Sequence, residues 1–80
     1  MTRNEVENEV LAILKSYLSR DDIRLEDTYE DLGFDSIDTI ELIMIYEEHF
    51  SLHKIEDKDF EKISSVYDIV NYVCNELRIK

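Results

Sequence analysis

Apolar side chains in this sequence recur mostly at helical spacing. In residues 3–18 they fall on one helical face, which is formed by Val6, Val10, Ile13, Leu14, Tyr17 and Leu18. Thr2, followed three residues later by Glu5, has the pattern of a capping box, so a first helix is predicted from about Arg3 to Leu18. Ser65 and Asp68 repeat that pattern before a last helix, whose apolar face consists of Val66, Ile69, Val70, Val73 and Leu77.

The middle of the chain predicts a second long helix and a short third one. Asp35 or Ser36 can cap a helix that continues to about Phe50, and residues 55–62 predict a short helical turn that carries Phe60 towards the core. Residues 19–35 are mostly polar, but we expect them to pack across the bundle through Ile23, Leu25, Tyr29, Leu32 and Phe34. With one glycine, no proline and no long alternating pattern, strands have little support. The predicted fold class is therefore all-α: a single domain over residues 1–80, built as a small four-helix bundle with three longer helices, one short helix and a long first loop.

The charge of the chain narrows its possible partners. Twenty acidic and nine basic residues give a formal charge of -11, which argues against nucleic acid and favours proteins with basic patches. No apolar run approaches the roughly 20 residues that span a bilayer, and the acidic start of the chain is unlike a signal peptide. The single cysteine, Cys74, cannot form an intramolecular disulfide and is expected to be a small packed residue. We expect a cytoplasmic monomer without a membrane span.

The second helix carries two apolar stripes rather than one. At 3.6 residues per turn, Thr39, Leu42, Ile43, Tyr46 and Phe50 share the side that we assign to the core. Nearly opposite lie Ile37, Ile40 and Met44, interleaved with Glu41, Glu47 and Glu48. Apolar side chains with an acidic rim are typical of a docking surface, so this outer stripe predicts contact with other proteins.

The start of the second helix closely resembles the phosphopantetheine attachment region of acyl carrier proteins. The resemblance is carried by Asp31-Leu32-Gly33-Phe34-Asp35-Ser36-Ile37-Asp38-Thr39-Ile40-Glu41-Leu42, continues through Met44, Glu47, Glu48 and Phe50, and includes Glu61-Lys62-Ile63-Ser64-Ser65-Val66 before the last helix. It covers most of the chain. The sequence departs from the family pattern at Ile37, Phe34 and Tyr46, and the segment after the second helix is one residue longer than usual and lacks the frequent proline.

The resemblance implies a function for individual residues. A phosphopantetheinyl transferase, using coenzyme A and magnesium, would attach 4'-phosphopantetheine to Ser36, with Gly33 and Asp35 as parts of the motif. The arm would hold acyl groups as thioesters for fatty-acid or polyketide synthase enzymes with basic patches. Their recognition would involve Ile37, Asp38, Ile40, Glu41, Met44, Glu47 and Glu48, and an inner acyl pocket would involve Leu42, Tyr46, Phe50 and Ile63.

Other functions are also open to the sequence. A carrier for aminoacyl, peptidyl or other specialised groups is the nearest alternative, and a non-covalent acidic module that leaves Ser36 unmodified is another. The sequence contains no pairing of a nucleophile with a general base, no phosphate-binding glycine loop and no metal-ligand cluster, so it does not predict an enzyme. His49 and His53 could share a helix face, but a lone pair near a helix end is typical of a surface feature rather than a metal site.

Overall fold

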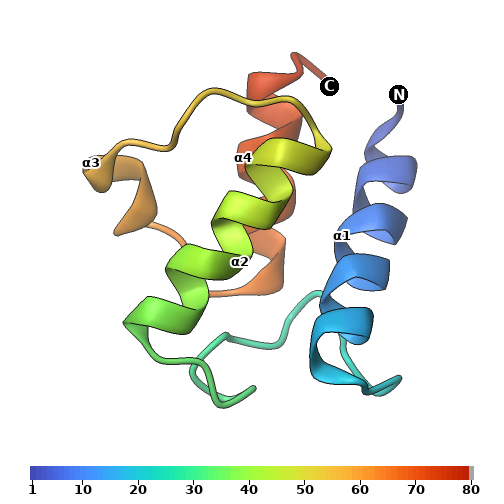
Figure 1. Cartoon of the computed structure of the whole chain (residues 1–80). Coiled ribbons are helices and arrows are strands. Elements are labelled where there is room, and N and C mark those ends of the chain that lie inside the picture. Colours follow the sequence, from blue (N-terminus) through green and yellow to red (C-terminus); the bar gives the residue numbers. More distant parts are fainter. Residues whose placement is uncertain (80) are drawn as a thin grey trace.

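The computed structural model describes residues 1–79, apart from the side chain of Asp57, and these residues form four helices (Figure 1). They are α1 (Arg3–Leu18), α2 (Ser36–His49), α3 (Asp57–Phe60) and α4 (Val66–Glu76). Within this part of the chain the extended backbone is limited to one isolated antiparallel bridge between Thr28 and Ser65. The predicted all-α bundle with three longer helices and one short helix is confirmed.

Capping boxes start all three longer helices. Thr2 and Glu5 form the one at α1, and Ser65 and Asp68 form the one at α4, as the sequence predicts. At α2 the cap is Asp35, so Ser36 is the first helical residue. Each box provides hydrogen-bond partners for N–H groups that have none within the helix, which fixes where the helix begins. The position of Ser36 at a helix start therefore follows from local sequence.

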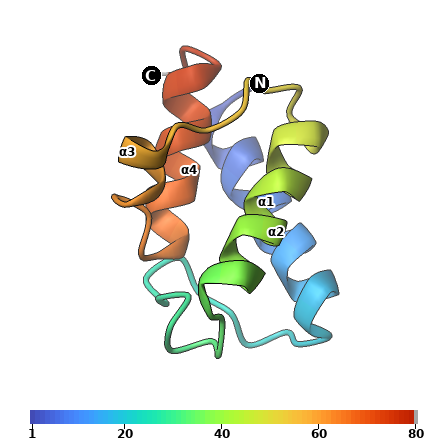
Figure 2. The same ribbon diagram turned by 60° about the vertical axis from the view of Figure 1, so that its left-hand side comes forward.

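The core lies among α1, α2 and α4, the three longer helices (Figure 2), and of these α1 and α4 make the closest contact. Its fully buried side chains come from α1, α2 and α4 and are Val6, Val10, Leu14, Leu42, Tyr46, Val66, Val70 and Val73. Cys74 is also buried, as predicted. Tyr17 differs from the prediction: it is 40% exposed, because it lies at the margin of the α1 face and packs beside the start of α2 instead.

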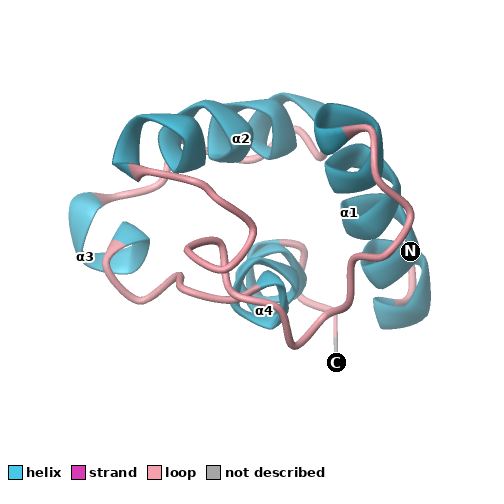
Figure 3. Cartoon of the chain, turned by 90° about the horizontal axis from the view of Figure 1, so that it is seen from below, coloured by secondary structure: helices cyan, strands magenta, loops and turns pink. Residues whose placement is uncertain are grey.

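The long connection between α1 and α2 is tied to the start of α4. The N–H of Tyr29 donates to the carbonyl of Ser64 at 2.9 Å, and the N–H of Val66 donates to the carbonyl of Asp27 at 2.9 Å. Ile23, Tyr29 and Phe34 are buried, which confirms that this segment packs across the bundle. Figure 3 shows the resulting arrangement, with α4 seen end-on between α1 and α3 and with α2 lying across one side.

The third helix is shorter than predicted. It covers Asp57–Phe60 rather than residues 55–62, and Phe60 is only half-buried. Residues 52–56 instead form an open connection from α2 to α3, so Ile55 precedes the helix. None of the helices within residues 1–79 has the length and hydropathy needed to cross a bilayer.

Candidate functional site: an exposed serine at the start of α2

Ser36 is exposed at the first turn of α2. The Asp35 carboxylate accepts a hydrogen bond from the N–H of Asp38 at 2.8 Å, and the N–H of Asp35 donates to the Asp38 carboxylate at 3.4 Å. Within the described residues, no partner accepts from the N–H of Ser36 or Ile37. A free hydroxyl next to unpaired N–H groups and the positive end of a helix dipole is a suitable place for a phosphate ester. The residues present therefore fit the attachment of phosphopantetheine.

The loop before Ser36 is held by a buried aromatic side chain. The Phe34 ring packs edge-on against Tyr29, with ring centroids 5.6 Å apart, and stacks on Tyr17 at 5.7 Å. The N–H of Phe34 also donates to the carbonyl of Tyr29 at 2.9 Å. Gly33 has a φ of +89° and open space around it. Glycine is therefore favoured here by the backbone conformation and not by a lack of room for a side chain. The backbone that leads to Ser36 is therefore held in place, although the Ser36 side chain itself is exposed to solvent.

Acidic side chains surround this end of α2. The Tyr17 hydroxyl donates to the Glu41 carboxylate at 3.4 Å. Partial burial and the negative charges of Glu41, Asp38 and Asp35 raise the pKa of Tyr17 above its ordinary value. The neutral phenol is favoured because removing its proton would add one more negative charge to this cluster. The region around Ser36 thus presents a negative field.

Helix α2 has the two stripes that the sequence predicts. Ile37, Ile40 and Met44 are 67%, 46% and 59% exposed on the outer stripe. Thr39, Leu42, Ile43, Tyr46 and Phe50 are buried on the inner one. The acids divide into two kinds: Glu41 and Glu48 are exposed, whereas Glu47 is half-buried and its carboxylate accepts a hydrogen bond from the N–H of Ile55.

The residues predicted to form an inner acyl pocket lie in a filled part of the structure. Leu42 and Tyr46 are fully buried, Phe50 is 7% exposed, and Ile63 is partly buried against the core. The Tyr46 hydroxyl donates to the carbonyl of Val10 on α1 at 3.1 Å. Burial raises the pKa of Tyr46, so its phenol stays neutral. An acyl pocket at these positions remains a prediction, and it would require the Tyr46 ring to move.

Open space lies along the edge of α2 where its inner and outer stripes meet. A groove of about 690 Å³ runs between α2 and the segment that leads to α3. Its lining residues are Ile40, Ile43, Met44, Glu47, Glu48, Leu52, Lys54, Ile55 and Phe60. The sequence did not predict this groove. The only signal for it was the presence of the apolar residues Leu52, Ile55 and Phe60 in a mostly polar stretch. The sequence also did not predict the position of Ile45, which is 38% exposed beside Tyr17 at the edge between α1 and α2.

Metal ligands are not gathered in the described part of the chain. Within residues 1–79, no three His, Cys, Asp or Glu side chains are placed to hold a metal ion. His49 lies 3.6 Å from the Glu9 carboxylate and packs edge-on against Phe50. His53 is exposed on the connection to α3.

Comparison with known proteins agrees with this geometry. Residues 8–73 match the family described as "Phosphopantetheine attachment site". The acyl carrier protein of Chloroherpeton thalassium is 42% identical over 79 residues, which cover 95% of this chain and 98% of that protein. The acyl carrier protein of Thermotoga maritima is 37% identical over 79 residues, which cover 95% of this chain and 96% of that protein. A crystal structure of an acyl carrier protein from Thermotoga maritima matches with a TM-score of 0.79 and 35% identity, covering 98% of this chain and 93% of that one.

By class, this chain is a phosphopantetheine attachment domain. It belongs to the acyl carrier protein family. Members of that family are carriers rather than catalysts, and their prosthetic group is 4'-phosphopantetheine.

Proposed function

We propose that Ser36 is the residue that receives 4'-phosphopantetheine, and that the chain then carries acyl groups for fatty-acid synthesis or a related lipid or polyketide pathway. The observation that supports this most is an exposed serine at the first position of α2, within a chain of this family. When attached, the group supplies a terminal thiol that holds the acyl chain as a thioester.

The residues around Ser36 have distinct roles in this proposal. The Ser36 oxygen forms the phosphodiester while a transferase removes the nucleotide part of coenzyme A. Unpaired N–H groups of Ser36 and Ile37 stabilise the new phosphate, together with the helix dipole. Asp35 fixes the start of α2 through its hydrogen bond with Asp38, and Gly33 supplies the positive φ that brings the loop to it.

We propose the outer stripe of α2 as the surface that partner enzymes contact. Ile37, Ile40 and Met44 provide exposed apolar area, and Asp38, Glu41 and Glu48 provide negative charge around it. A transferase or synthase enzyme with a basic patch would be guided by this charge and held by burial of the apolar side chains. Glu47 belongs to the same face, but its hydrogen bond to Ile55 gives it a further role.

The groove beside α2 is the place where an acyl chain can first leave water. It begins at Ile40, about 6 Å along the helix axis from Ser36 at about 1.5 Å per residue. Its wall is largely apolar, and each buried methylene would be stabilised by about 0.8 kcal/mol. Deeper entry, to the position of Leu42, Tyr46, Phe50 and Ile63, would need the Tyr46 ring to be displaced, so long chains would enter less readily than short ones.

Incubation with coenzyme A, magnesium and a broad-specificity phosphopantetheinyl transferase tests the proposed function. Intact mass spectrometry should show the gain of one phosphopantetheine per chain. An unmodified chain, with a known carrier modified in the same tube, would contradict it and would favour the non-covalent acidic module instead.

We also propose that the chain works as a cytoplasmic monomer. Its one cysteine is buried, and its net charge of -11 opposes association between copies. Light scattering after gel filtration should give the mass of a single chain, and a dimer mass at micromolar concentration would contradict the monomer.

A further inference from the structure

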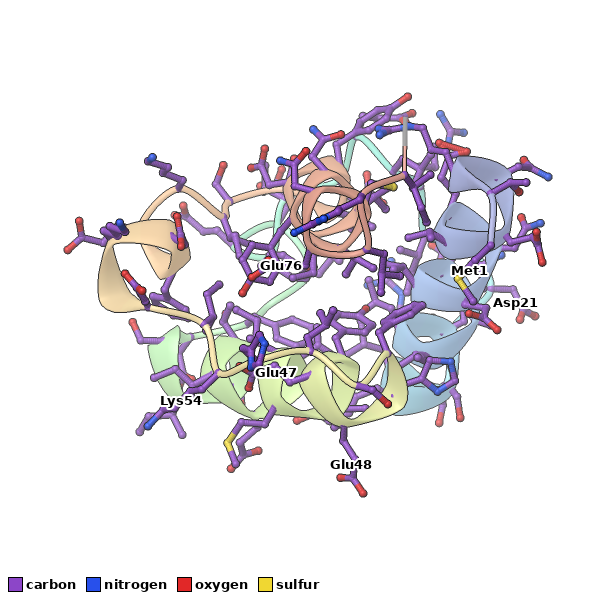
Figure 4. All side chains as sticks on the ribbon, turned by 90° about the horizontal axis from the view of Figure 1, so that it is seen from above. Met1, Asp21, Glu47, Glu48, Lys54 and Glu76 are labelled. Carbon is purple, nitrogen blue, oxygen red and sulfur yellow. The ribbon has the colours of Figure 1, made fainter. Side chains whose placement is uncertain are left out.

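Glu47 differs from the neighbouring Glu48 because its carboxylate is engaged inside the protein. Its Oε2 accepts a hydrogen bond from the backbone N–H of Ile55, and its side chain is half-buried. Glu48 is exposed and points away from the bundle, whereas Glu47 lies beside the chain segment that crosses over α2 (Figure 4). Two adjacent glutamates of one helix therefore have different surroundings.

The hydrogen bond of Glu47 joins the two sides of the groove. Ile40, Ile43, Met44 and Glu47 follow the pattern i, i+3, i+4, i+7, so they lie along one face of α2 and form one side of the groove. Ile55 lies on the other side, with Leu52 and Phe60. Among the described residues, no other hydrogen bond joins residues 53–56 to α2. Without it, this part of the wall would be held by side-chain packing alone.

The carboxylate of Glu47 also lies among like charges. Partial burial, a hydrogen bond to Glu76 and the negative charges of Glu76, Glu47 and Asp59 raise the pKa of the Tyr72 phenol above its ordinary value. Glu47 on α2, Glu76 on α4 and Asp59 on α3 therefore bring negative charge to the region of the Tyr72 hydroxyl. In such surroundings a carboxylate is stabilised by a charge-assisted N–H donor, and Ile55 supplies one.

We propose that Glu47 is a positioning residue that holds the connection from α2 to α3 against α2, and thereby keeps the groove closed around an acyl chain. The part of this inference that concerns cargo rests on the proposed function. The hydrogen bond itself exists without the prosthetic group, so it can be tested separately. Glu47 thus acts within the protein, in addition to contributing to its acidic surface.

The first experiment measures hydrogen exchange of the Ile55 amide by NMR in the unmodified protein. Glu47→Ala should make this amide exchange about tenfold faster or more, because a hydrogen bond to a charged acceptor is lost. Glu48→Ala is the matched control, since it removes the same charge from the next residue of the same helix, and it should leave the rate within about twofold. Equal Ile55 exchange in the two variants would overturn the proposal.

The second experiment measures protection of cargo. Thioesters of the modified protein are treated with hydroxylamine, and the loss of the acyl group is followed by mass spectrometry. An octanoyl group should be lost several-fold faster from Glu47→Ala than from Glu61→Ala, which removes an exposed glutamate outside the groove, whereas an acetyl group, too short to fill the groove, should be lost equally fast from both. Unfolding curves of the two variants check that a general loss of stability is not the cause. The rate of octanoyl loss from Glu47→Gln should fall between the rates for wild type and Glu47→Ala.

Each failure has a different meaning. An unchanged octanoyl rate in Glu47→Ala, with Ile55 exchange accelerated, would overturn the role in holding cargo. A chain that cannot be modified at all would contradict the proposed function, but the exchange of Ile55 would still decide whether Glu47 holds the connection.

Discussion

The two sides of this bundle differ in how closely their side chains are packed. On the side formed by α1 and α4, which we call the packed side, Val6, Val10, Leu14, Val70 and Val73 are fully buried. On the side formed by the outer face of α2, residues 50–56 and α3, which we call the open side, a groove of about 690 Å³ remains and Ile37, Ile40 and Met44 are exposed. The packed side supplies the stability of the fold, whereas the open side leaves apolar surface free for binding.

The largest expected effect comes from removing equal side chains on the two sides. Leu14→Ala should lower the free energy of unfolding by about 2–5 kcal/mol, because it opens a cavity among fully buried neighbours. Leu52→Ala on the groove wall should lower it by about 1 kcal/mol, since Leu52 is only half-buried. Urea unfolding followed by circular dichroism measures both. Equal losses would show that the two sides do not differ in packing.

Two buried tyrosines sharpen the comparison within the core. The Tyr46 hydroxyl donates to the carbonyl of Val10 and thereby links α2 to α1, whereas the buried Tyr29 hydroxyl has no hydrogen-bond partner in the described structure. Tyr46→Phe should cost about 1 kcal/mol of unfolding free energy, and Tyr29→Phe should be neutral or stabilising. The same unfolding assay applies, and a larger loss from Tyr29→Phe would contradict this distinction.

The start of α4 makes stability on the packed side depend on pH. Burial opposes ionisation of Asp68, but hydrogen bonds from Ser64 and Ser65 outweigh it and lower the pKa of Asp68. A carboxyl whose pKa is lowered by folding stabilises the protein above its unfolded pKa, about 3.9, and loses this effect as the pH falls through the folded pKa. Asp68→Asn should therefore cost about 1 kcal/mol at neutral pH, and the difference from wild type should shrink in acid. A difference independent of pH would contradict the assignment.

The smallest effect on stability is expected on the open side, together with a clear effect on binding. Glu41→Lys with Glu48→Lys should change the free energy of unfolding by about 0.5 kcal/mol or less, because both side chains are exposed. The double variant should associate more slowly with the transferase and show a weaker dependence on salt.

The matched control for this double variant is Asp21→Lys with Glu26→Lys, which makes the same change of net charge at two exposed residues of the first loop. Stopped-flow association at low salt compares the two proteins. Equal rates would mean that the overall charge, rather than the acids of α2, guides the encounter.

Most of the fold could be predicted because its signals are local. Capping boxes at Thr2 and Ser65 and the apolar periodicity of the first and last helices fix those elements within a few residues of sequence. The same is true of Ser36: the helix start and the attachment motif are both read from neighbouring residues. The division of α2 into buried and exposed stripes also follows from periodicity alone.

The features that could not be predicted depend on contacts between distant residues. Tyr17 has the spacing of a core residue, but its ring stacks on Phe34 at the margin of the bundle and stays 40% exposed. Glu47 and Glu48 are adjacent glutamates that the sequence alone does not distinguish. Only the path of the connection to α3 brings the Ile55 amide close to the Glu47 carboxylate. The groove arises from that same path, since α3 is shorter than its sequence suggests and leaves Leu52 and Ile55 facing α2.

The most direct test of the account is the mass of the modified protein with and without Ser36. Wild type, Ser36→Ala and Ser16→Ala are each incubated with coenzyme A and the transferase, and the intact masses are compared. Ser16 is an exposed serine of α1 and serves as the control. Wild type and Ser16→Ala should each gain one phosphopantetheine, whereas Ser36→Ala should gain none and should remain folded by circular dichroism. An adduct that persists on folded Ser36→Ala would contradict the assignment of the attachment site.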